Sequence, residues 1–229
     1  MSHTERLTAV FDRLADDGTA ERSELLLDDV VRQALDAMEV RPGHQLLDVG
    51  CGAGWTTRRL GKKAPGAQAV GIDVAPGMIA KADGLSDWTS RARFECAAIE
   101  SFDAPDARFD HVLALDVLEF VEDPGRSLAS IARVTKPGGR LELLVHRHAG
   151  SPSSEGWAEL YDLPMHWLAD SDWAAHVAGA GFAVDATDVL RDARDAAPFE
   201  PSLVAPDEAT HDALRAAGVL RIRATRSGE

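Results

Sequence analysis

The sequence predicts an α/β protein built on a parallel sheet. Between residues 45 and 145, short apolar runs alternate with stretches of helical period, which is typical of parallel strands joined by helices. The first apolar run, Gln45–Val49, leads into a turn containing Gly50, Gly52 and Gly54. The length of 229 residues is enough for one domain with a sizeable core.

Two helices are expected before the sheet begins. Apolar residues recur at helical spacing from about Thr4 to Ala15. After Gly18, Ser23 is the expected N-cap of a second helix, whose apolar stripe ends near Met38. The turn Arg41-Pro42-Gly43 then leads the chain into the first strand.

Seven strands are expected in all, at Gln45–Val49, Gln68–Ile72, about Ala92–Cys96, Phe109–Leu115, Arg140–Val145, Phe182–Leu190 and Val219–Thr225. One connecting helix begins at Asp123-Pro124, with proline at the first helical position, and should end at Lys136–Gly139. The other connecting helices are expected at Pro76, from about Ser171 to Ala178, and after Pro206.

Composition excludes several classes of protein. The formal net charge of −14 disfavours binding of nucleic acid through phosphate neutralisation. No apolar run approaches the ~20 residues of a membrane span, and the charged N-terminus lacks a signal-peptide core. We therefore expect a cytoplasmic protein with no membrane or nucleic-acid partner. Its two cysteines, Cys51 and Cys96, form no metal-ligand pattern and are expected to be small buried thiols.

The glycine turn indicates a ligand site. Glycines allow the backbone to approach a ligand, and the following helix directs unpaired N–H groups at it. The spacing here is G-x-G-x-G, whereas dinucleotide enzymes use G-x-G-x-x-G. Asp48 precedes the turn, and its carboxylate would repel a pyrophosphate but suits a cation. These features favour S-adenosylmethionine, which carries an ammonium group and a sulfonium, over NAD.

Three motifs together resemble the class I S-adenosylmethionine-dependent methyltransferases of the ubiquinone/menaquinone and small-molecule type. The motifs are LLDVGCGAG (46–54), GIDVAPGMIAKA (71–82) and FDHVLALDVLEFVEDPGRSLASIARVTKPGGRLEL (109–143). The resemblance implies a Rossmann-like three-layer sandwich with a seven-stranded, mainly parallel sheet and an antiparallel C-terminal strand. It also implies a single domain, 1–229, with an N-terminal helical cap (1–40), a cofactor-binding core (41–149), and a lid with the C-terminal strands (150–229).

The resemblance assigns cofactor contacts to individual residues. Asp73 ends the second strand, where a carboxylate can accept hydrogen bonds from both ribose hydroxyls. Asp48 would hold the methionine ammonium group, Met78 and the 97–99 segment would border the adenine, and Leu115 would border the methionine moiety. The expected cofactor-binding residues are Asp48, Gly50, Gly52, Gly54, Asp73, Val74, Met78, Ala98, Ile99 and Leu115.

The reaction implied is direct displacement at a sulfonium methyl group, which requires alignment and exclusion of water. A hydroxyl acceptor needs a base, and His146, immediately after the fifth strand, is the leading candidate. Asp116 and Glu119 are candidates for orienting an amine. The expected substrate-binding residues are His148, Tyr161, His166 and Trp167. Because the chain contains no asparagine, an Asp/Asp/Asn magnesium site cannot form, so we expect a metal-independent enzyme.

The leading hypothesis is methyl transfer to a hydroxyl or amine of a small molecule, with secondary metabolites as one candidate class, by a monomer or homodimer. The alternative is a non-catalytic S-adenosylmethionine-binding protein on the same fold. A nicotinamide-dependent dehydrogenase is disfavoured by the glycine spacing and by Asp48. The aromatic-rich segment 151–173 is expected to form a lid that closes on substrate, meeting Phe11 and Leu14 of the first helix.

Overall fold

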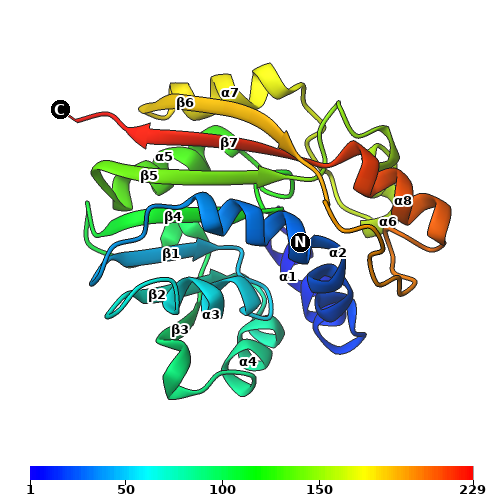
Figure 1. Cartoon of the computed structure of the whole chain (residues 1–229), viewed down its shortest axis with the longest axis horizontal. Helices are drawn as coiled ribbons and strands as arrows, with labels where there is room; N and C mark the ends of the chain where they lie inside the picture. Colours follow the sequence, from blue (N-terminus) through cyan, green and yellow to red (C-terminus); the bar gives the residue numbers. More distant parts are fainter. Residues whose placement is uncertain (229) are drawn as a thin grey trace.

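A computed structural model describes residues 1–228 and contains one seven-stranded sheet (Figure 1). The strand order is β3-β2-β1-β4-β5-β7-β6. Strands β1 to β5 pair in parallel, whereas β7 pairs antiparallel with both β5 and β6. The predicted fold class, a mainly parallel seven-stranded sheet with an antiparallel C-terminal strand, is confirmed.

The strands lie close to their predicted positions: β1 Gln45–Val49, β2 Gln68–Asp73, β3 Ala92–Cys96, β4 Phe109–Leu115, β5 Thr135–Val145, β6 Phe182–Leu190 and β7 Val219–Arg226. The α-helices are α1 His3–Asp16, α2 Thr19–Ala37, α3 Trp55–Gly61, α4 Pro76–Gly84, α5 Pro124–Val134, α6 Trp157–Tyr161, α7 Asp170–Gly179 and α8 Glu208–Ala217. Three short 3-10 turns lie at η1 Trp88–Ser90, η2 Ile99–Ser101 and η3 Pro152–Ser154.

Two hydrophobic cores make the molecule a three-layer sandwich. On one face of the sheet, Leu128 and Ile131 of α5 and Trp173 of α7 pack against β4, β5 and β7. On the other face, apolar residues of α2 and α3 pack against Leu46 of β1 and Leu113 of β4. The central parallel strands β1, β2 and β4 are therefore buried on both sides, which explains their nearly continuous apolar runs.

The predicted ends of two elements were wrong. Helix α2 begins at Thr19 instead of after Ser23, because Asp17 accepts a hydrogen bond from the Thr19 N–H and Gly18 takes a left-handed φ of 82°. Helix α5 ends at Val134, and Thr135 already pairs with Phe109, so Lys136–Gly139 lies within β5. A register shift after Phe109 accommodates this segment, which continues the strand instead of stopping the helix.

Cys96 corrects a further prediction. Cys51 is buried as expected, but Cys96 is exposed, because β3 forms an edge of the sheet. Within residues 1–228, no helix is long and apolar enough to cross a membrane.

Helix α1 and the segment after β5 gather at the carboxyl ends of the parallel strands, on the right of Figure 1. Leu7, Val10 and Leu14 of α1 pack with Met78 of α4 and Leu163 of the 151–170 segment. These residues form a separate hydrophobic cluster above the strand ends, and the candidate site lies between this cluster and the sheet.

Candidate active site

The glycine turn brings backbone against two other elements. A Cβ at Gly54 would lie 2.4 Å from the ring of Phe94, and one at Gly50 would lie 2.6 Å from a methyl group of Val117. Both glycines also have left-handed φ values, 77° and 69°. The turn therefore requires glycine for conformation and for space, which is why the sequence motif is so specific.

Asp73, at the end of β2, binds the turn directly. Its Oδ2 accepts a hydrogen bond from the Gly52 N–H at 2.9 Å, and its Oδ1 accepts one from the Ala75 N–H at 2.9 Å. Burial raises the pKa of this carboxyl, although the two backbone donors oppose that effect. Asp73 is therefore held in one orientation before any ligand arrives, and it lies in the wall of a cavity.

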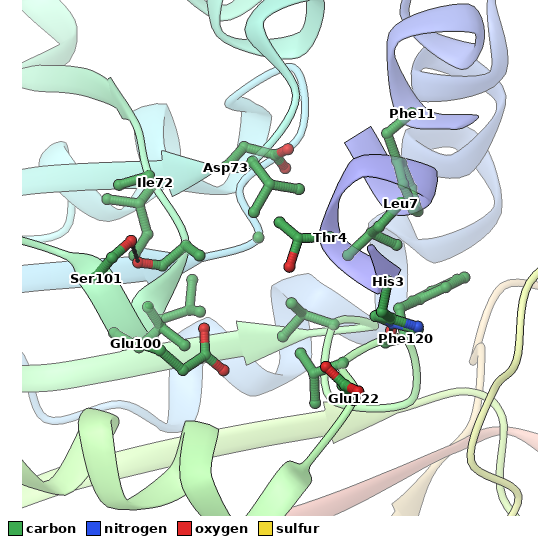
Figure 2. A pocket seen from close by; sticks show the side chains of 18 of the residues that line it. His3, Thr4, Leu7, Phe11, Ile72, Asp73, Glu100, Ser101, Phe120 and Glu122 are labelled. Atoms are coloured by element: carbon green, nitrogen blue, oxygen red, sulfur yellow. Dashed lines mark hydrogen bonds between the residues drawn. The ribbon is translucent and has the colours of Figure 1, made fainter. Parts of the chain in front are cut away.

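The cavity has a volume of about 670 Å³ and lies between the strand ends and α1 (Figure 2). Its size is in the range of small-molecule sites, ~300–1,000 Å³. Figure 2 shows His3, Thr4 and Leu7 of α1 facing Ile72, Asp73 and Glu100 across it. The complete lining is His3, Thr4, Leu7, Phe11, Val49, Gly50, Ile72, Asp73, Val74, Ala97, Ala98, Ile99, Glu100, Ser101, Asp116, Val117, Phe120, Val121, Glu122, Asp123 and Arg126.

The structure brings together half of the residues predicted to bind cofactor. Those that line the cavity are Gly50, Asp73, Val74, Ala98 and Ile99. Those that lie outside its lining are Asp48, Gly52, Gly54, Met78 and Leu115. Gly52 and Gly54 shape the turn, and Met78 packs between α1 and α4.

Asp48 is buried beneath the turn, with 1% of its surface exposed. Its Oδ2 accepts hydrogen bonds from the hydroxyls of Thr56 at 2.5 Å and Thr57 at 2.6 Å, both in the first turn of α3. Burial raises its pKa to about 6 despite these donors. Asp48 thus connects β1 to α3, and its predicted contact with the methionine ammonium group stays a prediction.

Asp116, directly after β4, also lines the cavity. Its Oδ1 accepts a hydrogen bond from the His146 backbone N–H at 2.7 Å, and burial raises its pKa to about 7. Glu119 follows within the same turn, is fully buried, and has a pKa well above its usual range because of burial and the Asp116 charge. Two carboxyl groups therefore lie together at the cavity wall.

His146, the predicted base, lies behind Asp116 and not in the cavity wall. Its ring Nδ1 is 3.9 Å from Asp116 Oδ2, and its ring packs edge-on against Trp157 with centroids 5.1 Å apart. Burial lowers its pKa to about 3, so the imidazole is neutral. A substrate in the cavity would meet Asp116 before His146.

The four predicted substrate-binding residues also lie outside the cavity lining. His148 Nδ1 bonds Asp170 at 2.8 Å, and the Trp167 indole donates to the His148 carbonyl at 3.0 Å. His166 Nε2 bonds the Val121 carbonyl at 3.0 Å, and Tyr161 packs on Phe120. His166 and Tyr161 thus contact the lining residues Val121 and Phe120, and contact of all four residues with substrate stays a prediction.

Helix α1 contributes lining residues that the sequence reasoning missed: His3, Thr4 and Leu7. The His3 ring bonds the Phe120 carbonyl at 2.6 Å, which ties the start of the helix to the turn after β4. Phe11 also lines the cavity, although it was expected only to meet the lid. In the sequence, this helix shows only an apolar stripe. Such a stripe indicates that one face is buried, but it does not show which part of the protein that face covers.

Comparison with known proteins defines the class. Residues 47–143 match the family described as a methyltransferase domain. This match identifies residues 47–143 as a methyltransferase domain, and the strand order agrees with the class I, S-adenosylmethionine-dependent enzymes that the sequence resembles.

Particular relatives are similar over part of their length. A malonyl-[acyl-carrier protein] O-methyltransferase of Halorhodospira halophila is 30% identical over 157 residues, 67% of this chain and 53% of the relative. A ubiquinone biosynthesis O-methyltransferase of Hahella chejuensis is 37% identical over 109 residues, 47% of this chain and 45% of the relative. The chain spans about half the length of these curated relatives.

One solved structure is similar over nearly the whole chain. It is a Haloferax volcanii methyltransferase in complex with the Trm112 methyltransferase activator, with a TM-score of 0.84 and 24% identity. The alignment covers 95% of this chain and 98% of that one. At this level of identity the likeness shows a shared fold.

Proposed function

We propose that this protein transfers a methyl group from S-adenosylmethionine to a hydroxyl or amine of a small molecule by metal-independent displacement. The observation that carries the proposal is the single cavity that connects Asp73 with Asp116. Asp73 and the 97–99 segment are suited to the ribose and adenine, whereas Asp116 offers a carboxyl group to an acceptor in the same cavity. One continuous space can therefore hold cofactor and acceptor in line.

The wall above the strands supports the same proposal. Helix α1 covers the cavity with Leu7 and Phe11, and Phe120 closes it from the turn after β4. An apolar cover excludes water from the sulfonium, and a displacement reaction depends mainly on this exclusion and on alignment. The protein needs to supply little covalent chemistry of its own.

Calorimetry and a transfer assay test the proposal. We expect S-adenosylhomocysteine to bind and NAD not to bind, and we expect the tritiated methyl group of S-adenosylmethionine to appear on a small acceptor. Binding of S-adenosylhomocysteine without transfer to any small amine, alcohol or phenol would favour the alternative of a non-catalytic binding protein. Equal affinity for NAD would contradict the proposal.

A partner protein belongs to the same proposal, because the chain has an exposed docking edge. The indole of Trp88 is 90% exposed and Leu85 is 55% exposed, and both precede the edge strand β3. The Arg91 carbonyl and the Ala97 N–H bond β2, so the alternation of a strand turns the backbone groups of Phe94 and Cys96 outward. A Trm112-type activator, as in the Haloferax volcanii complex, is the partner we propose for this edge.

A further inference from the structure

Two carboxyl groups lie together after β4, and one of them is in the cavity wall. Asp116 is 20% exposed in its side chain and lines the cavity, whereas Glu119 is fully buried and makes contact with it from behind. Neither Glu119 oxygen accepts a hydrogen bond from an N–H or O–H group of the described residues. Because two ionised carboxylates repel each other, the contact requires one shared proton, and Glu119 is the carboxyl that carries it.

The groups around Asp116 and Glu119 favour the ionised form of Asp116. The His146 backbone N–H donates to Asp116, and a protonated Glu119 would donate a second hydrogen bond, so both groups favour the Asp116 carboxylate. The His146 ring is neutral and supplies no charge. Arg147 lies near Glu119, and Tyr161 faces both carboxyls, with the pKa of its hydroxyl raised by burial and by their charges. Asp116 thus presents a negative charge to the cavity once it loses its proton, near neutral pH.

The rest of the lining makes the cavity acidic and apolar. Its charged residues are Asp73, Glu100, Asp116, Glu122 and Asp123 against the single cation Arg126, with His3 as a further titratable group. Asp73 is bound by the glycine turn, Glu100 bonds the Ser127 hydroxyl and Asp123 caps α5. Leu7, Phe11 and Phe120 add an apolar surface to the same lining. Such a lining attracts a cation with an apolar body and repels carboxylates and phosphates.

We propose that the methyl acceptor is a small amine with an apolar body, that Asp116 binds its ammonium group and removes a proton from it, and that Glu119 is a positioning residue that keeps Asp116 ionised. This inference rests on the proposed methyl transfer and names its substrate class. It moves the proton acceptor from His146, which lies outside the cavity, to Asp116 in its wall.

The proton and electron balance is simple. The ammonium group gives one proton to an Asp116 carboxylate oxygen, which leaves a neutral amine with a free electron pair. That pair forms the N–C bond to the sulfonium methyl group, and the electrons of the breaking C–S bond stay on sulfur, giving S-adenosylhomocysteine. The methylated ammonium product leaves with its charge, and Asp116 releases its proton to water when the cavity opens.

Calorimetry with simple probes tests the substrate class without requiring the natural acceptor. Benzylamine, benzyl alcohol and benzoate are titrated into protein saturated with S-adenosylhomocysteine. We expect benzylamine to bind tightest and benzoate not to bind. Asp116→Asn should weaken benzylamine about 10- to 100-fold, the loss expected for a charge-assisted hydrogen bond, whereas Asp103→Asn, at an exposed acid outside the cavity, should not.

The pH dependence tests Glu119. Benzylamine stays protonated through this range, so its affinity should rise with pH as Asp116 ionises around pH 7. Glu119→Leu removes the donor to Asp116 and should move the midpoint to higher pH. Glu119→Gln keeps an N–H donor to Asp116 and should leave the midpoint of the pH dependence unchanged. If Glu119 acted only by filling space, leucine and glutamine would have the same effect.

Each outcome is decisive. Benzoate or benzyl alcohol binding as tightly as benzylamine, or an unchanged affinity in a folded Asp116→Asn variant, would overturn the amine assignment. If that variant does not fold, the two Glu119 variants decide, and equal midpoints in both would overturn the role of Glu119. Failure of S-adenosylhomocysteine to bind would instead contradict the proposed function itself.

Discussion

The ring of Phe11 in α1 lies edge-on against the ring of Phe120 after β4, with centroids 5.2 Å apart and planes at 84°. Phe11 also stacks on Tyr161 of α6 at 6.3 Å, so three segments distant in sequence meet at one point. Phe11 and Phe120 both line the cavity. This contact therefore joins helix α1, which covers the cavity, to the turn after β4, which also lines it.

Phe11→Ala should weaken binding of S-adenosylhomocysteine and lower the free energy of unfolding by about 1–2 kcal/mol, because it removes two aromatic contacts and opens the cavity wall. Val10→Ala is the matched control, since Val10 is buried in the same helix but lies outside the cavity lining. Calorimetry and urea unfolding of both variants separate the two effects. Equal losses of affinity would show that α1 acts only through overall stability.

Asp73→Ala should weaken cofactor binding by about 2–3 kcal/mol and also destabilise the ligand-free protein by about 1–3 kcal/mol. From sequence alone a strand-end carboxylate is expected to contribute little to stability, but Asp73 accepts hydrogen bonds from Gly52 and Ala75 and is 8% exposed. Asp83→Ala, at an exposed acid on α4, is the control. An unchanged dissociation constant for S-adenosylhomocysteine would remove Asp73 from the site.

Asp48→Asn should become progressively more stable than the parent as pH rises from about 4 to about 6. The folded-state pKa of Asp48 is raised from 3.8 to about 6, so ionisation opposes folding across this window. Between these pH values the folded parent binds more protons than its unfolded state, so its stability falls as pH rises, whereas that of Asp48→Asn does not. The free energy of unfolding of the variant relative to the parent should therefore increase by about 3 kcal/mol from below pH 4 to above pH 6. Urea unfolding at pH 4.5 and pH 7.5 measures it, and a difference that does not change with pH would contradict the assignment.

Trp88→Ala should abolish association with a Trm112-type activator in co-expression and size-exclusion experiments, while changing the free energy of unfolding by less than about 0.5 kcal/mol. A side chain that is 90% exposed contributes little to the isolated fold. Leu160→Ala, at another exposed apolar residue, should leave association intact. Retention of the activator by the Trp88 variant would place the partner elsewhere.

The sheet was predictable because its central parallel strands, β1, β2 and β4, are buried on both faces and read as apolar runs. Strand β4, Phe109–Leu115, has the limits expected from its apolar run. The order of the strands in the sheet could not be predicted from the apolar runs. Cys96 was expected to be buried, and only the strand order reveals that β3 is an edge.

Site residues could be predicted where the position of the backbone alone places the residue in the site. Gly50 and Asp73 are fixed by the turn and the strand end, and both line the cavity. Side-chain direction was harder to predict, since Asp48 turns toward Thr56 and Thr57 and His146 toward Trp157. Those orientations depend on partners contributed by other elements, which sequence spacing does not specify.

The position of His3 and Thr4 in the cavity wall has a practical consequence for producing the protein. A purification tag fused before Met1 would end two residues before His3 in the cavity wall, where a histidine-rich peptide could compete with ligands. The other end of the chain is safer. Arg226 of β7 pairs with Phe182, and Thr225 pairs with Arg140 near the start of β5, at the end of these strands away from the carboxyl end of β5. Binding experiments on this protein are therefore best performed with a carboxyl-terminal tag.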